Sequence, residues 1–553
     1  MNRMKKALVF FLLGATLLTT AFGCAETGKK EGNDTATPTE DSAMQNQITE
    51  DRSNDSQISK ASVPSRALAS MLSAFSEAGL SMHSVLVMRH GEVVAECYAP
   101  PFDENSLHRM YSVSKSFVGM SVGLLLSDPD YSHLFPQGID TKIGDLTCFS
   151  DLLNPSTDER IKNTKIVDLL RMAAPFPKGS TYDGPNDMNW LATFFDPADG
   201  RKPDHDAGTG FHYDTSASYL LGVMVERITG MTFLEYLKRN ALHEIGFSEN
   251  SWCVEAPEGY AWGGSGVMCT TRDIAAFAYL VMRGGNWNGK QLLPADYVRA
   301  ATSYQIAIPS GEDDNCTGYG YQIWITDFGF AFLGMGCQLA FCVPSMDLVF
   351  ACTADNQGYQ KNGKDDEDTV FEIFRRHLLA KLTDGIVTET SADRELLNRQ
   401  IAAFGIPAQK GSGSSPLAST VSGKTYSGSG AAFFSFRLTF EDASGTLFYT
   451  TSRGDKELRF GLGENLICLL DEPQYSGRAI NHPNGKGYRA LCSGAWTDRD
   501  TFVLWVQVCD DYFGNMKMTF DFSGEKSVTV TVTKTAEWFL EEYKMKKVEY
   551  TGN

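Results

Sequence analysis

The residues most suited to chemistry are Ser112 and Lys115, in the segment His108-Arg-Met-Tyr-Ser-Val-Ser-Lys115. Apolar residues recur at helical spacing after Ser112, which predicts that a helix begins there. Residues three apart share a helix face, so the lysine amine is expected to reach the serine hydroxyl and remove its proton. For this, burial or neighbouring cations must lower the pKa of Lys115. The spacing alone does not establish catalysis, because it recurs at Ser523 and Lys526 in a predicted β-turn, and because a helix-capping role explains Ser112 equally well.

Three later segments add to this pattern. Tyr213 lies just before a second predicted helix, within Gly210–Gly230. The glycine-rich segment Gly263–Ala278 follows, and then the apolar segment Phe332–Ala351, which predicts two strands joined by a turn.

In this order, the four segments resemble the serine β-lactamase and penicillin-binding-protein superfamily, and most closely its class C-like serine hydrolases, which include esterases and amidases. The resemblance covers residues 65–385. It implies an α+β fold, with an antiparallel sheet flanked by helices plus a helical region. It also implies that Ser112 is the acylated nucleophile, that Lys115 is its proton partner, and that Tyr213 carries protons to the leaving group. The alternative for Tyr213 is a half-buried structural tyrosine.

The sequence departs from the family pattern in two places. Thr215 stands where the second motif often has asparagine, and Phe332-Leu333-Gly334 aligns with the usual Lys-Thr-Gly or His-Thr-Gly triplet. This triplet offers no cation or hydroxyl to hold a substrate carboxylate, which disfavours β-lactam and D-Ala-D-Ala substrates. The resemblance still implies an oxyanion hole from the N–H groups of Ser112 and Met335, since backbone donors tolerate any side chain. The candidate substrate-binding residues are therefore Thr215, Gly334, Met335 and Gln338, with His108 as a further candidate for the cleft or for a structural role.

The first 24 residues have the pattern of an export signal. A basic start is followed by an apolar run too short to span a membrane comfortably. The run ends in Ala21-Phe22-Gly23-Cys24, which resembles a bacterial lipobox and implies a signal peptide over residues 1–23 and a lipid on the Cys24 thiol. The polar residues 24–62 predict a disordered tether. We therefore expect an exported protein, anchored by lipid on the outer face of a bacterial membrane, at the cell surface or in the periplasm.

The rest of the chain divides into three predicted parts. Residues 63–385 form the hydrolase domain, and residues 386–420 hold a helix over 393–404 and a Gly/Ser linker at Gly411–Pro416. Residues 421–553 are expected to form an antiparallel β domain, a barrel or a sandwich, because apolar residues alternate with polar ones there. The alternating sets are Phe436, Leu438 and Phe440; Met516, Met518, Phe520 and Phe522; and Val528, Val530 and Val532.

Composition excludes several function classes. The net charge of −19 argues against a nucleic-acid partner, which needs a concentrated basic face. No phosphate loop, dinucleotide fingerprint or zinc pattern stands in a suitable setting, so no cofactor and no metal are expected. Apart from Cys24 there are eleven cysteines, an odd number, and we expect them to pack as small hydrophobic residues.

The sequence thus predicts a membrane-tethered serine hydrolase that cleaves an ester or amide, with peptides and cell-wall fragments among the candidate substrates. A true β-lactamase or D,D-peptidase is the alternative enzyme. A non-catalytic binding protein with the same fold is the third hypothesis. The oligomeric state has no signature in the sequence.

Overall fold

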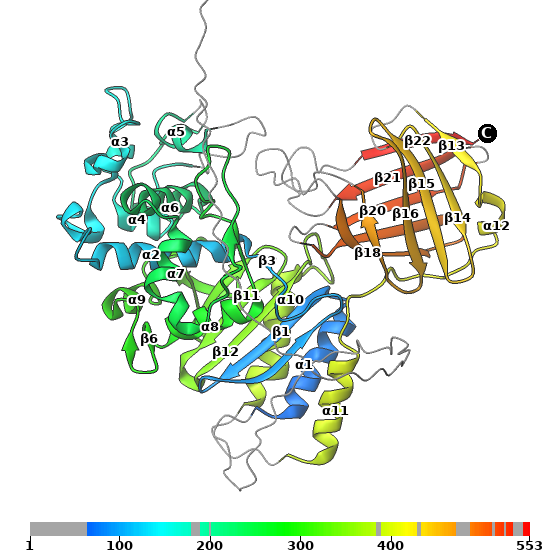
Figure 1. Ribbon diagram of the computed structural model, residues 1–553, viewed down its shortest axis with the longest axis horizontal. Helices are drawn as coiled ribbons and strands as arrows, with labels where there is room; N and C mark the ends of the chain where they lie inside the picture. Colours follow the sequence, from blue (N-terminus) through cyan, green and yellow to red (C-terminus); the bar gives the residue numbers. More distant parts are fainter. Residues whose placement is uncertain are drawn as a thin grey trace, which may run out of the picture. The chain divides into compact units, whose positions relative to one another are not determined.

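The computed structural model describes residues 63–177, 189–197, 201–382, 389–428, 433–471, 487–510, 515–524, 527–534 and 546–552. The expected signal peptide, the expected lipidation site Cys24 and the expected tether lie outside these residues, as does Lys526 of the second Ser-x-x-Lys pattern. Along the chain, an α+β region is followed by a β-barrel (Figure 1). The predicted fold class is therefore confirmed.

A seven-stranded antiparallel sheet forms the centre of the α+β region, in the order β2-β1-β12-β11-β10-β9-β8. The first hairpin turns at His90 and Gly91, where the sequence predicts a turn, and both residues have positive φ values, 52° and 84°. β1 and β12 are buried along their whole lengths, as expected for strands covered on both faces. The strands are β1 Met82–Arg89, β2 Glu92–Tyr98, β8 Cys316–Tyr319, β9 Trp324–Thr326, β10 Phe330–Gly334, β11 Gln338–Val343 and β12 Leu348–Ala354.

The prediction of two strands over Phe332–Ala351 is wrong, because this segment contributes to three strands, β10, β11 and β12. A second turn lies at Pro344–Met346 and ends on Asp347, which has a φ of 48°. Since helices cover both faces of the sheet, the strands on either side of this turn are apolar at almost every position. The turn therefore interrupts the apolar run only briefly, and the periodicity does not reveal it.

Helices cover both faces of this sheet (Figure 1). On one face Phe341 of β11 packs against Phe371 of α10, with ring centres 4.3 Å apart, and α1 and α11 complete the layer. On the other face Phe277 of α8 packs against Phe332 of β10, at 5.4 Å. The helix predicted over 393–404 is present as α11. The helices of these layers are α1 Ser65–Ala78, α8 Thr271–Met282, α10 Asp366–Ile373 and α11 Ser391–Ala402, with a π turn η8 Phe374–Leu378 and a 3-10 turn η9 Leu379–Lys381 after α10.

The predicted helical region is built around α2, Ser114–Ser127, which is buried on nearly all sides. Its sequence carries one charged residue, Lys115, and a helix that is apolar all round must be enclosed by others. Gly123 permits the closest of these contacts, because a Cβ there would lie 2.3 Å from the Tyr297 ring. The helices that pack against α2 are α6 Thr215–Thr229, α7 Phe233–Asn240 and α9 Ala295–Ala301, and the helical region also contains α3 Glu159–Asn163, α4 Ile166–Leu170 and α5 Trp190–Phe195.

Short elements connect the helical region to the large sheet. They include a three-stranded sheet in the order β3-β5-β4 and a β6–β7 hairpin. The strands are β3 His108–Arg109, β4 Trp252–Cys253, β5 Val267–Cys269, β6 Asn286–Trp287 and β7 Lys290–Gln291. The 3-10 turns are η1 Tyr111–Val113, η2 Ser132–Leu134, η3 Gly138–Asp140, η4 Ile143–Asp145, η5 Thr147–Phe149, η6 Leu242–Ile245 and η7 Pro344–Met346.

The C-terminal region is a closed β-barrel, which resolves the predicted choice between a barrel and a sandwich. Strands run antiparallel in the order β16-β15-β14-β13-β22-β21-β20-β19-β18-β17, and a short parallel pairing of β16 with β18 closes the ring. The predicted alternation is confirmed: Phe436, Met518 and Phe520 are buried inside. The elements are α12 Ala418–Val421, β13 Thr425–Ser427, β14 Ser435–Phe440, β15 Ser444–Thr451, β16 Gly454–Leu462, β17 Leu466–Leu470, β18 Tyr488–Trp496, β19 Thr501–Val508, β20 Asn515–Asp521, β21 Ser527–Lys534 and β22 Lys546–Gly552.

The Gly/Ser segment before the barrel is held in place, although its composition predicts a flexible linker. Ser412 and Trp496 exchange two backbone hydrogen bonds of 2.8 Å. Gly411 makes this approach possible, because a Cβ there would lie 2.5 Å from the Trp496 carbonyl oxygen. Composition predicts the flexibility of a segment that has no tertiary contacts, whereas here the end of β18 supplies hydrogen-bond partners for it.

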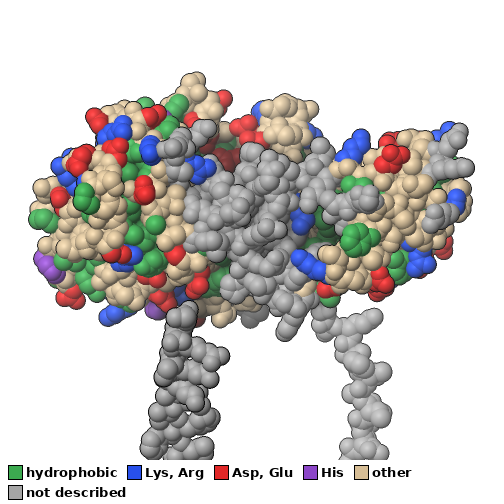
Figure 2. All heavy atoms as spheres, turned by 90° about the horizontal axis from the view of Figure 1, so that it is seen from above, with side chains coloured by type: hydrophobic (Ala, Val, Ile, Leu, Met, Phe, Trp, Pro, Cys, Tyr) green, Lys and Arg blue, Asp and Glu red, His purple; other side chains and the backbone are tan. Residues whose placement is uncertain are grey.

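Two observations bear on the expected membrane setting of the protein and on its expected partners. Within the described ranges, no helix is both long enough and apolar enough to cross a membrane. Basic and acidic side chains are interspersed over the described surface seen in Figure 2.

Eleven cysteines between Cys97 and Cys509 are free thiols, and eight of them are buried, in agreement with the expectation that they pack as small hydrophobic residues.

Candidate active site

Ser112 lies in the 3-10 turn η1, directly before α2, rather than in the helix itself. Lys115 belongs to the first turn of α2, and its Nζ lies 2.9 Å from Ser112 Oγ. The same Nζ donates a 2.7 Å hydrogen bond to the carbonyl oxygen of Gly264, from the glycine-rich segment. The predicted approach of amine and hydroxyl is therefore present in the structure.

The setting of Lys115 favours a neutral amine. The side chain is 1% exposed, and burial lowers its pKa from the ordinary 10.5 to about 7, because the ammonium form loses its hydration. The carboxyl group of Asp214 opposes this shift by attracting the charged form. A lysine with a pKa close to neutrality is able both to accept and to return a proton.

Tyr213 lies beside this pair, just before α6. Lys115 Nζ is 5.0 Å from the centre of the Tyr213 ring. The ring stacks on Trp324 of β9, at 5.4 Å between centres, and its plane is perpendicular to that of Tyr319. The structure thus brings Ser112, Lys115 and Tyr213 together, while their catalytic roles remain predictions.

The residues after Tyr213 differ from the expectation. Thr215, which stands where the second motif often has asparagine, makes no hydrogen bond to Lys115 within the described residues. Its methyl group faces Gly264 instead, because a Cβ on this glycine would lie 2.2 Å from Thr215 Cγ2. The close approach of α6 fixes the Gly264 carbonyl, which then orients Lys115.

Asp214 is a site residue that the sequence analysis missed. It caps α6, accepting a 2.8 Å hydrogen bond from the Ser216 amide, and it is 3% exposed. Its other carboxylate oxygen is buried and has no hydrogen-bond partner within the described residues. An aspartate before a helix is an ordinary capping signal, so the sequence does not reveal that this carboxyl group also faces Lys115.

The triplet Phe332-Leu333-Gly334 ends β10, which packs against the turn η1 that holds Ser112. Phe332 and Leu333 are buried in opposite layers of the core. Gly334 is required by close packing, because a Cβ there would lie 2.4 Å from the Met110 carbonyl oxygen. Met335 follows directly and starts the turn to β11, and the triplet itself carries no charged side chain.

Gln338 and His108, two candidates for the substrate cleft, are instead buried and contact other protein groups. Gln338 is fully buried, and its Nε2 donates to the carbonyl oxygens of Met335 (3.2 Å) and Ala354 (2.6 Å), so it braces the turn behind Met335. His108 is also buried, with its Nε2 3.1 Å from Nδ1 of His83, and burial lowers its pKa to about 4. Both side chains are buried in the interior, and the sequence pattern does not distinguish such positions from ones that line a cleft.

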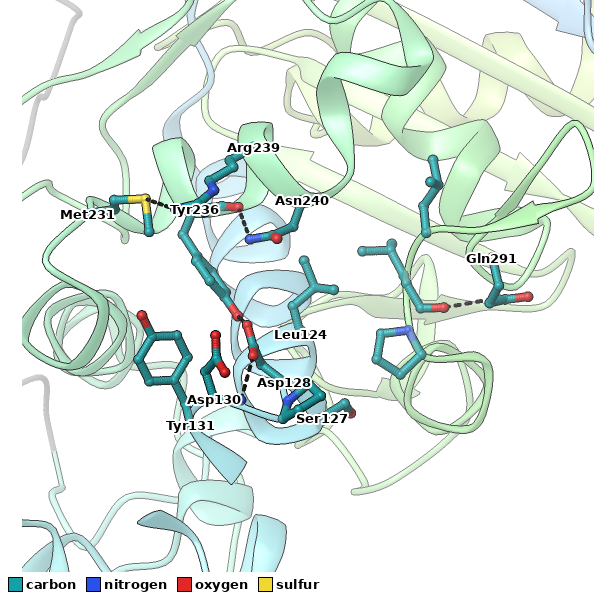
Figure 3. Close-up of a pocket in the computed structure, with 14 residues that line it drawn as sticks. Leu124, Ser127, Asp128, Asp130, Tyr131, Met231, Tyr236, Arg239, Asn240 and Gln291 are labelled. Atoms are coloured by element: carbon teal, nitrogen blue, oxygen red, sulfur yellow. Dashed lines mark hydrogen bonds between the residues drawn. The ribbon is translucent and has the colours of Figure 1, made fainter. Parts of the chain in front are cut away.

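A separate cavity of about 530 Å³ lies at the opposite end of α2, between α7 and the β6–β7 hairpin (Figure 3). Its polar groups bind one another: Tyr236 Oη donates to Asp128 at 2.7 Å, and Asn240 Nδ2 donates to the Tyr236 carbonyl oxygen at 2.8 Å. This cavity does not belong to the Ser112 site. Among the described residues, no group of three or more His, Cys, Asp or Glu side chains is arranged to hold a metal ion.

Known proteins resemble the region that holds this site. Residues 68–374, more than half of the chain, match the sequence model of the Beta-lactamase family. The 6-aminohexanoate-dimer hydrolase of Paenarthrobacter ureafaciens is 27% identical over 222 residues, which are 39% of this chain and 55% of that protein, so the chain spans about half of this relative.

Two solved structures were also found to be similar. A penicillin-binding-protein homologue from Caulobacter crescentus has a TM-score of 0.45 and 15% identity, covering 58% of this chain and 99% of that one. An octameric penicillin-binding-protein homologue from Pyrococcus abyssi has a TM-score of 0.43 and 13% identity, covering 87% of this chain and 99% of that one.

Proposed function

Since the chain belongs to the Beta-lactamase family, we propose that it is a serine hydrolase that cleaves an ester or amide through an acyl-enzyme on Ser112. The observation that carries this proposal is the 2.9 Å approach of Lys115 Nζ to Ser112 Oγ in a buried setting. A hydroxyl group is a poor nucleophile at neutral pH unless an adjacent base removes its proton. A neutral Lys115 is such a base.

The proposed reaction has two halves. Ser112 attacks the substrate carbonyl while its proton passes to Lys115, and the amides of Ser112 and Met335 bind the resulting oxyanion. Tyr213, beside the Lys115 amine, donates its proton to the leaving group, and Lys115 passes the proton taken from Ser112 on to Tyr213. Water then attacks the acyl-enzyme and gives a proton to Lys115, which returns it to the departing Ser112 oxygen. These roles follow the family pattern, and the distances around Lys115 support them.

The proposed substrate is an ester or amide whose recognition does not depend on a carboxylate bound at the third motif. The side chains of Phe332 and Leu333 are apolar and buried, so this strand offers no cation there. The relative named a 6-aminohexanoate-dimer hydrolase supports an amide, and peptides and cell-wall fragments stay among the candidates. The lack of a carboxylate grip disfavours the alternatives of a β-lactamase and a D,D-peptidase.

A substrate panel tests this proposal. The purified protein is assayed with a p-nitrophenyl ester, the linear 6-aminohexanoate dimer and a chromogenic cephalosporin, each with a Ser112→Ala variant beside it. We expect turnover of the ester or the amide, reduced about 1000-fold or more in Ser112→Ala. Faster turnover of the cephalosporin would favour a β-lactamase. Turnover that persists in Ser112→Ala would exclude this nucleophile, and no turnover at all would favour a binding protein.

We further propose that a lipid on Cys24 anchors the protein to the outer face of a bacterial membrane. The support is the sequence alone: the basic start, the apolar run and the small residues before Cys24. Growth of expressing cells with an alkyne fatty acid should label the full chain. The label should disappear in Cys24→Ala, and that variant should leave the membrane fraction. Labelling that survives Cys24→Ala would contradict the anchor.

A further inference from the structure

We propose that the segment Asp355–Gln357, directly after β12, is a positioning element that holds both halves of the oxyanion hole. The inference rests on the proposed function, because it concerns the same Ser112 site. In this arrangement Gln357 holds Tyr111, beside the first amide, and Asn356 holds Gly336, beside the second. The segment acts on the hole through Tyr111 and Gly336.

The first half needs support because Tyr111 has an unusual backbone. It directly precedes Ser112 and has a φ of 45°, a left-handed conformation that a bulky residue adopts only when its surroundings impose it. The ring is fully enclosed, with the Arg109 guanidinium 4.5 Å above its centre. Its hydroxyl oxygen accepts a 3.2 Å hydrogen bond from Gln357 Nε2. These side-chain contacts fix the peptide from which the Ser112 amide and hydroxyl project.

The second half is the turn between β10 and β11, which carries Met335. Asn356 donates its backbone N–H to the Gly336 carbonyl oxygen at 3.2 Å. Gly336 has a φ of 75°, and a Cβ there would lie 3.3 Å from Gln357 Cγ, so the turn rests on the segment. Asn356 is itself fixed, because its Oδ1 accepts a 2.7 Å hydrogen bond from the Ser81 amide.

Asp355 determines which way the Gln357 amide faces. Its Oδ1 accepts a 3.3 Å hydrogen bond from Gln357 Nε2, the same nitrogen that donates to Tyr111. Both hydrogens of this nitrogen therefore have acceptors. Asp355 is 2% exposed, and burial raises its pKa to about 7. Two buried hydrogen bonds thus connect the Asp355 carboxyl group, the Gln357 carboxamide and the phenol of Tyr111, the residue before Ser112.

The test separates positioning from folding. Gln357→Met keeps the volume of the side chain and removes both donated hydrogen bonds, and Tyr111→Phe removes the acceptor. Activity on a p-nitrophenyl ester is measured per Ser112 site, counted by complete fluorophosphonate titration. We expect kcat to fall between about 10- and 100-fold in each variant, with KM changed less than about 3-fold. The double variant should lose no more than the worse single one, since both changes break the same hydrogen bond.

A matched control and two contrary outcomes complete the experiment. Gln291→Met removes an amide that also bonds two groups, the carbonyl oxygens of Gly284 and Leu293, but at the opposite end of α2, and it should keep kcat. Unchanged kcat per site in Gln357→Met, or losses that multiply in the double variant, would overturn the proposal. If Gln357→Met does not fold, Tyr111→Phe decides alone, and unchanged kcat overturns the proposal. Activity that survives Ser112→Ala would instead overturn the proposed function.

Discussion

Replacing Lys115 with methionine should stabilise the protein at neutral pH while abolishing its activity. Methionine has a similar length and no charge to bury, and Lys115 is 1% exposed. The folded state holds the pKa of this amine at about 7, against its ordinary 10.5. Because the unfolded chain binds the proton more tightly, the lysine destabilises the fold wherever the unfolded amine is charged.

The magnitude follows from these two values. One pKa unit corresponds to about 1.4 kcal/mol, so the penalty reaches about 5 kcal/mol below pH 7, is about 4 kcal/mol at pH 7 and falls to about 1 kcal/mol at pH 10. Methionine also loses the hydrogen bonds to Ser112 and Gly264, which costs about 1–3 kcal/mol at every pH. We therefore expect a net gain of about 1–3 kcal/mol at pH 7, which shrinks or reverses by pH 10.

The assay is denaturant unfolding followed by tryptophan fluorescence, under reducing conditions, at pH 7, 8.5 and 10. Lys424→Met, which changes an exposed lysine, serves as the control and should alter the free energy of unfolding by less than about 0.5 kcal/mol. A Lys115→Met effect of the same size at pH 7 and pH 10 would refute the reasoning, because it would mean that Lys115 takes up no proton on unfolding in this range.

Three other predictions concern groups in or near the proposed site. The value of kcat/KM should rise with pH through about 7, because the neutral form of Lys115 is the base. Asp214→Asn should move this rise to lower pH by about one unit, since it removes the charge that favours the ammonium form, and an unmoved pH profile would contradict this. Tyr213→Phe should lower kcat between about 10²- and 10⁴-fold, and wild-type turnover would exclude its role. Because burial raises the pKa of Asp355 to about 7, the folded protein loses stability as pH rises from about 4 to 7. The free energy of unfolding of Asp355→Asn, relative to that of the wild-type protein, should therefore be higher at pH 8 than at pH 4. Denaturation curves measure it, and an equal difference at both pH values would contradict the burial argument.

The parts of the site that the sequence predicts are the local ones. Ser112 and Lys115 are three residues apart, so helical spacing is enough to bring them together. The alternation in the C-terminal strands likewise depends on neighbours two residues apart, and it predicted the β domain correctly. In both cases the short-range pattern agrees with the final fold.

The remaining parts depend on contacts between distant positions. The Gly264 carbonyl that orients Lys115 is 149 residues away from it, and the Gln357 amide that holds Tyr111 is 246 residues away. No spacing rule links such pairs. Gln338 is the opposite case, in which a predicted role is not supported. A polar residue near a motif was expected to bind substrate, whereas the sheet buries its side chain against backbone carbonyl groups.

The central claim is that Ser112 is the nucleophile, and a labelled adduct tests it most directly. The purified protein is treated with a fluorophosphonate probe, digested and analysed by mass spectrometry. We predict one adduct, on the peptide that contains Ser112, and its loss in Ser112→Ala. An adduct that persists unchanged in Ser112→Ala, or that maps to another residue in the wild-type protein, would contradict the assignment.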